Sequence, residues 1–94
     1  MLAVEDIKKK IKKFISETYR LPEEDLDETA NLFEGIIDSL GAAEVVMFLE
    51  KEFDVKLKNA HLFDKRFVYI QGMASVIFEI TQARVNGKVN KKGN

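Results

Sequence analysis

The chain has 94 residues, with 15 basic and 16 acidic side chains, one histidine and no cysteine. This length fits a single domain with one hydrophobic core. The composition excludes disulfide scaffolds, thiolate metal sites and cysteine nucleophiles, and the lone His61 excludes two-histidine zinc motifs. The apolar runs are too short to span a bilayer, and the residues after Met1 do not resemble a signal peptide, so we expect a cytoplasmic protein.

The net charge of −1 hides an uneven distribution of charged residues. Residues 17–54 contain twelve acidic and two basic side chains, whereas residues 84–94 contain four basic side chains and no acidic one. An acidic surface repels nucleic-acid phosphates and attracts basic protein surfaces, so we expect no nucleic-acid binding by the central region. We interpret residues 84–94 as a basic, disordered polar tail that follows a domain of residues 1–83.

The N-terminal segment has apolar residues at steps of three and four, which predicts an amphipathic helix. Its lysines, between residues 8 and 13, are interpreted as the solvated face of that helix. The helix is expected to end near Leu21–Pro22, because the residue before a proline is disfavoured in helical conformation. The predicted apolar stripe consists of Val4, Ile7, Ile11, Phe14, Ile15 and Thr18.

Residues 22–38 show no sustained periodicity and predict a long loop with a turn at Gly35. A loop of this length in a small domain is often functional. We expect its scattered apolar side chains to attach it to the core; they are Leu26, Leu32, Phe33, Ile36 and Ile37.

Asp38 is a favourable N-cap for a second helix that reaches Phe53. A short helical turn is expected between Asn59 and Arg66, and a last helix from about Tyr69 to Arg84, stopped by Asn86–Gly87. Phe67–Ile70 could form a strand but has no partner strand. The predicted fold class is all-α, a small bundle of three to four helices. The predicted inward stripe of the second helix is Leu40, Ala43, Val46, Met47, Phe48 and Phe53, and that of the last helix is Ile70, Met73, Ala74, Ile77, Phe78 and Thr81.

The sequence offers few combinations of catalytic side chains, so we expect that the protein is not an enzyme. His61 would need to reach Ser16, Ser39 or Ser75 to form a triad, and so small a bundle has little volume to enclose a substrate. An EF-hand reading of the segment that begins at Asp25 fails, because Ala30 replaces the turn glycine and Ile36 replaces the bidentate glutamate. We therefore expect no specific metal site.

The tripeptide Asp38-Ser39-Leu40 is the remaining candidate site. Its serine lies at the predicted start of a helix that follows a long loop, so its hydroxyl should be exposed. A phosphate attached there would face free backbone N–H groups and the positive end of the helix dipole. This position suits a phosphodiester, although a helix cap alone would explain the same three residues.

The segment Leu32-Phe33-Glu34-Gly35-Ile36-Ile37-Asp38-Ser39-Leu40, followed by residues 44–53, resembles the acyl carrier protein family, and the resemblance covers about residues 4–83. It implies that Ser39 carries 4′-phosphopantetheine, placed there from coenzyme A by a phosphopantetheinyl transferase, and that the arm holds acyl groups as thioesters for fatty acid, lipid or related biosynthesis. Asp38 would cap the helix and present the serine. Glu44 and Glu50 would meet basic patches on acyl- or aminoacyl-loading ligases, acyltransferases and synthases, and Leu40 would contact partner enzymes or anchor the helix start. We also expect a monomer.

Val46, Phe53 and Ile77 would line any apolar space that shelters the cargo, or would be core residues only. The chain departs from typical fatty-acid-synthesis carriers at Gly41, where those have an acid, and before the last helix, where those are acidic and this chain has Lys56, Lys58, Lys65 and Arg66. Gly41 and the segment Phe63-Asp64-Lys65-Arg66 look closer to D-alanyl and aminoacyl carrier proteins. A specialised aminoacyl carrier and an unmodified helical adaptor that binds through its acidic helix therefore stay open as alternatives.

Overall fold

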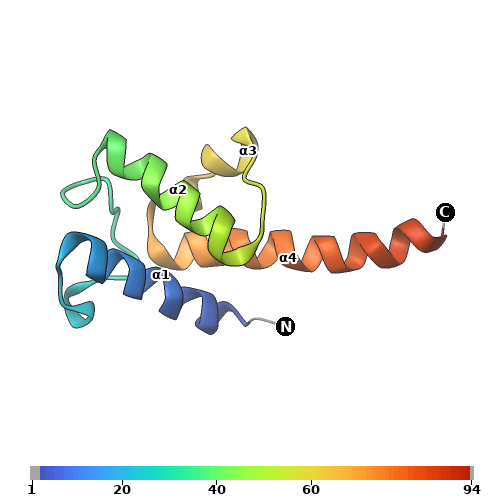
Figure 1. Cartoon of the computed structure of the whole chain (residues 1–94), viewed down its shortest axis with the longest axis horizontal. Helices are drawn as coiled ribbons and strands as arrows, with labels where there is room; N and C mark the ends of the chain where they lie inside the picture. Colours follow the sequence, from blue (N-terminus) through green and yellow to red (C-terminus); the bar gives the residue numbers. More distant parts are fainter. Residues whose placement is uncertain (1–2, 94) are drawn as a thin grey trace.

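The computed structural model describes residues 3–93, and the side chains of residues 3–85. Within this range the chain contains helices and no strand, which confirms the all-α prediction (Figure 1). The elements in chain order are α1 (Val4–Tyr19), η1 (Glu23–Asp25), α2 (Ser39–Phe53), α3 (Asn59–Leu62), η2 (Lys65–Val68) and α4 (Ile70–Gly93), where η marks a 3-10 helix.

Helix α1 begins and ends where local chemistry directs it. The Asp6 carboxylate accepts a 3.1 Å hydrogen bond from the Ala3 N–H at the N-terminus. At the C-terminus Arg20 adopts a left-handed conformation with φ 57°, and the N–H of Leu21 donates to the Ser16 carbonyl at 3.0 Å. The predicted stripe is confirmed for Ile7, Ile11 and Ile15, which are buried, and for Val4 and Phe14, which are partly buried. Thr18 is exposed, so its inclusion was wrong.

The lysines of α1 are less uniformly solvated than their spacing predicts. Lys8 forms ion pairs with Glu5 at 2.8 Å and with Glu28 at 3.2 Å, and Lys12 reaches Glu28 at 3.3 Å. Glu28 belongs to the long loop, so two lysines hold this loop against α1. The pKa of the Glu28 carboxyl is lowered, mainly by the hydrogen bond from Lys8.

The long loop is attached to the body as expected. Leu26, Leu32 and Ile37 are buried in the core, and the Leu32 N–H donates to the Val68 carbonyl at 2.8 Å. Gly35 has φ +135°, a conformation that glycine adopts without the steric cost of a Cβ. The loop therefore delivers the chain to the start of α2 in a defined position.

Helix α2 is rotated from the orientation that its sequence predicted. Leu40, Ala43 and Met47, assigned to the inward stripe, are exposed. The pattern misled because apolar residues occur around most of this helix, so several phases satisfy an apolar stripe equally well. Val46 and Phe48 are partly buried. The buried residues are Gly41, Val45, Leu49 and Phe53.

Between α2 and α4 the chain forms α3 and η2, so the helical turn predicted at Asn59–Arg66 is confirmed. The strand considered at Phe67–Ile70 is not formed. Arg66 binds Asp64 at 2.9 Å and Glu79 of α4 at 2.6 Å, which attaches this connection to the last helix. The two carboxylates raise the pKa of the Arg66 guanidinium, Glu79 contributing most.

Helix α4 lies beside α1 and extends beyond the rest of the molecule (Figure 1). Ile70, Met73, Ala74 and Ile77 are buried as predicted, together with Val76. The helix passes through Asn86–Gly87 to Gly93, so the predicted stop is wrong.

Arg84, predicted to belong to the tail, donates to the Asp54 carbonyl at 2.5 Å. The domain division after residue 83 and the disorder of the tail stay predictions, and the side chains of residues 86–94 lie outside the described part.

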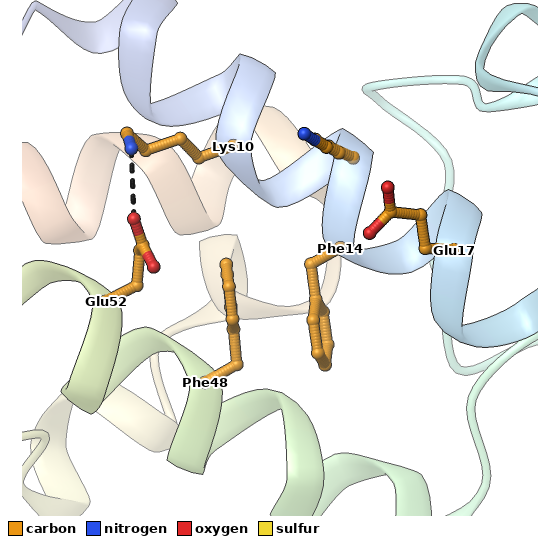
Figure 2. A pocket seen from close by; sticks show the side chains of 6 residues that line it. Lys10, Phe14, Glu17, Phe48 and Glu52 are labelled. Carbon is orange, nitrogen blue, oxygen red and sulfur yellow. Dashed lines mark hydrogen bonds and ion pairs between the residues drawn. The ribbon is translucent and has the colours of Figure 1, made fainter.

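The face between α1 and α2 holds an aromatic pair. The rings of Phe14 and Phe48 stack with centroids 4.1 Å apart and planes 11° apart. Figure 2 shows the two rings face to face, beside the ion pair of Lys10 with Glu52 at 3.0 Å. This contact joins the two helices at a partly open pocket of about 270 Å³.

Candidate functional site

The start of α2 is closed by its own N-cap, as the sequence predicted. Asp38 has extended backbone angles, and its Oδ1 accepts a 2.8 Å hydrogen bond from the Gly41 N–H. The Asp38 carbonyl accepts from the Ala42 N–H at 2.9 Å. One residue thus begins the helix and satisfies one of the N–H groups that every helix leaves unpaired in its first turn.

Ser39 is the first residue of α2, and its side chain is exposed. Its hydroxyl therefore lies at the positive end of the helix dipole and is accessible to another protein. These properties fit a covalently attached phosphate, since the helix terminus favours negative charge and the site has room for a bulky substituent.

The outward face of α2 begins beside this serine. Leu40 and Met47 are 81% and 68% exposed, and Glu44 between them is also exposed. Because the three positions are spaced by four and three residues, they lie along one side of the helix. We call Leu40, Glu44 and Met47 the outer stripe of α2.

Glu50 does not share this exposure. Its Oε2 accepts a 2.8 Å hydrogen bond from the Leu57 N–H, and the residue is half-buried. The structure thus gives this acid a role within the domain, in holding the segment after α2. Its role in partner binding stays a prediction.

His61 is occupied in a local cap. Its Nδ1 accepts a 2.9 Å hydrogen bond from the Lys58 N–H at the start of α3. Of the serines considered for a triad, Ser16 donates its hydroxyl to the Leu21 carbonyl at 2.5 Å. Both side chains therefore complete helix ends, which accounts for them without catalysis.

Other classes of site find no support in the part of the chain that the structure describes. Residues 3–85 contain no group of three histidine, cysteine or acidic side chains arranged to hold a metal ion. Among the described helices, none combines the length and hydropathy needed to cross a membrane.

An apolar pocket of about 220 Å³ lies behind the first turns of α2. Val46 lines it, as expected, whereas Phe53 and Ile77 do not and are buried in the core. The wall comes from the long loop, α2, α3 and η2, and consists of Phe33, Ala42, Ala43, Val45, Val46, Leu62, Phe67 and Val68.

Tyr19 is a feature of the site that the sequence did not indicate. Its hydroxyl is buried and has no hydrogen-bond partner among the described residues. Burial raises the pKa of this hydroxyl, and the negative charges of Glu44 and Asp38 add to the effect. These acids belong to the start of α2, so the tyrosine at the end of α1 lies against the candidate site.

A family model described as a phosphopantetheine attachment site matches residues 9–67. The chain belongs to this family. Its domains are attachment sites for 4′-phosphopantetheine and are carriers without catalytic activity of their own, which confirms the expectations for the cofactor and the enzyme class. No solved structure matches the chain.

Within this carrier the matched segment includes Asp38, Ser39 and Leu40 as well as Glu44 and Glu50. When bound, phosphopantetheine supplies a thiol that holds acyl groups as thioesters, which a chain without cysteine cannot do itself. The chain itself provides an exposed serine hydroxyl and a capped helix start within this segment. Interaction with modifying and loading enzymes follows from the carrier role.

Proposed function

We propose that the protein is a discrete acyl carrier in which Ser39 holds the phosphopantetheine arm. The observation that supports this residue is its exposed hydroxyl at the first position of α2, directly after the Asp38 cap. In the transfer, the Ser39 oxygen forms a phosphodiester with the pantetheine phosphate of coenzyme A. The hydroxyl proton is lost, and the bond to the adenosine bisphosphate half of coenzyme A breaks.

The cargo we favour is an aliphatic acyl group. The pocket behind α2 is lined by apolar side chains, and Ala42 and Ala43 bring it within one turn of Ser39. A methylene chain gains free energy when it leaves water for such a pocket, whereas a charged ammonium group would lose its hydration without a partner. This chemistry favours roles in fatty acid or lipid synthesis over an aminoacyl cargo.

The docking surface that we propose contains the outer stripe of α2. Leu40 and Met47 offer apolar contact next to the arm, and Glu44 offers a negative charge to basic patches on loading ligases, acyltransferases or synthases. Phe63, 84% exposed at the end of α3, is a further exposed apolar side chain. Exposed charges of this kind act mainly on association rate and partner choice.

An aminoacyl carrier is the second candidate. Phe63 and Lys65 are exposed in the segment after α3, and they differ in character from the acidic α2 face, which would suit a more specialised set of partners. Adenylating ligases would distinguish the two cargo classes. Loading by a fatty acyl ligase supports the first candidate, and loading by an amino-acid-activating ligase supports the second.

Intact-protein mass spectrometry tests the attachment site. The wild type is incubated with coenzyme A, Mg²⁺ and a phosphopantetheinyl transferase of broad specificity, beside Ser39→Ala and the matched control Ser75→Ala. We expect the wild type and Ser75→Ala to gain one phosphopantetheine and Ser39→Ala to gain none. Labelled Ser39→Ala would move the site elsewhere. A folded wild type that several transferases leave unlabelled would favour the unmodified adaptor.

A further inference from the structure

The unpartnered Tyr19 hydroxyl lies next to Gly41, in the first turn of α2. A Cβ built on Gly41 would overlap the Tyr19 hydroxyl oxygen, and it would also come within 3.1 Å of the Ile37 side chain and 3.3 Å of Asp38 Oδ1. Real Cβ atoms do not tolerate the first contact, and the other two are tighter than usual. The tyrosine therefore occupies the space that a side chain at residue 41 would need.

Gly41 is also the residue through which the N-cap acts. Its N–H donates to Asp38 Oδ1, so any shift of residue 41 moves the hydrogen bond that begins α2. Ser39 lies between these two partners in the chain. A displacement of Gly41 away from Tyr19 would therefore change the orientation of the turn that presents the serine hydroxyl.

We propose that Tyr19 is a positioning residue for the modification site, and that it acts by filling the space beside Gly41 and thereby setting the first turn of α2. This inference rests on the proposed attachment at Ser39. It explains why glycine stands at a helical position where other residues are more favourable: with Tyr19 in its present place, a Cβ at residue 41 would force the tyrosine or the helix turn to shift.

The inference predicts that Gly41→Ala changes the melting temperature in opposite directions in the presence and in the absence of Tyr19. In an open helix, alanine in place of glycine stabilises the fold. In this chain Gly41→Ala should instead lower the melting temperature, because the new methyl group meets the Tyr19 hydroxyl. When Tyr19→Leu removes that hydroxyl and the end of its ring, adding Gly41→Ala should raise the melting temperature. Tyr19→Phe, which removes only the oxygen, should give an intermediate result.

The same variants test the effect on modification. Labelling of Ser39 is followed by mass spectrometry at a temperature where every variant is folded, and kcat/KM of the transferase is obtained for each. We expect about a tenfold loss of kcat/KM for Gly41→Ala, because a displaced first turn holds the serine hydroxyl away from its reactive orientation, and recovery of kcat/KM in Tyr19→Leu/Gly41→Ala. Ile77→Val, a buried substitution in α4, provides a destabilised control that should be labelled at the wild-type rate.

Three results would overturn the inference while leaving the carrier function intact. They are an unchanged labelling rate in Gly41→Ala, a double variant as slow as Gly41→Ala alone, and an equal loss in Ile77→Val. An unlabelled wild type would instead reject the proposed function and, with it, the positioning role. Labelling of the wild type thus distinguishes a failure of the positioning role from a failure of the proposed function.

Discussion

Glu50 Oε2 accepts a 2.8 Å hydrogen bond from the Leu57 N–H, across the turn that ends α2. An acid that sequence comparison assigns to a docking surface thus holds the backbone that leads to α3. Leu57 is buried, and its N–H finds its acceptor in this carboxylate. Glu50 thus has a structural contact within the domain, whereas Glu44 on the same helix is exposed.

Replacing Glu50 by alanine should lower the free energy of unfolding by about 1–3 kcal/mol, the usual cost of a buried donor left unpaired. Glu50→Gln keeps an acceptor oxygen and should lose less. Urea unfolding of both variants, with Glu44→Ala as the exposed control, checks this expectation. A stability loss in Glu44→Ala equal to that in Glu50→Ala would contradict it.

Reversing the charge of Glu44 should affect encounter with partners more than stability. We expect Glu44→Lys to slow association with a basic partner such as a phosphopantetheinyl transferase, and the difference from wild type to shrink as salt is raised. Stopped-flow association rates at low and high ionic strength measure the effect. The association rate of Glu44→Gln, which removes the charge without reversing it, should lie between those of wild type and Glu44→Lys. Identical rates for these three proteins would exclude Glu44 from the docking surface.

The Asp38 cap should stabilise the fold whether or not Ser39 carries the phosphopantetheine arm. Asp38→Ala removes the acceptor for the Gly41 N–H and should cost about 1 kcal/mol of unfolding free energy. Asp38→Asn retains a side-chain oxygen and should stay close to wild type. Thermal unfolding of apo protein measures this cost without the arm, and equal melting temperatures for Asp38→Ala and wild type would argue against a working cap.

The Asp64–Arg66 pair predicts a pH dependence of stability. Hydrogen bonds from Arg66 lower the pKa of the Asp64 carboxyl from 3.8 to about 2. Because the folded state then binds fewer protons than the unfolded state, the contribution is complete above the unfolded pKa and is lost as the pH falls from about 4 through 2. Urea unfolding between pH 2 and 6 should show wild type and Asp64→Asn converging at the acidic end. A constant difference over that range would contradict the assignment.

The Phe14–Phe48 stack should couple α1 to α2. Each truncation to leucine removes one ring from the pair, and the double-mutant cycle isolates their interaction, which we expect at about 0.5–1.5 kcal/mol. Chemical denaturation of the wild type, the two single variants and the double variant provides the four values. Additive losses would mean that the two rings contribute only through the area that each buries.

The sequence was sufficient for features whose partners lie within a few residues. The cap at Asp38 acts on Gly41, three residues away, so its motif could be interpreted without the fold. The apolar spacing of α1 has one clear stripe, and Ile7, Ile11 and Ile15 are buried accordingly. Ser39 at the head of α2 follows from the same local chemistry.

The orientation of α2 and the restriction at residue 41 were decided by the tertiary structure, because both depend on contacts between distant segments. Apolar residues surround much of α2, and packing alone selected Val45 and Leu49 for the core and left Leu40 and Met47 outside. The overlap that restricts residue 41 comes from Tyr19, on another helix. The family and the attachment motif are thus properties of the local sequence, whereas the outer face and the shape of the modification site arise from how the helices pack.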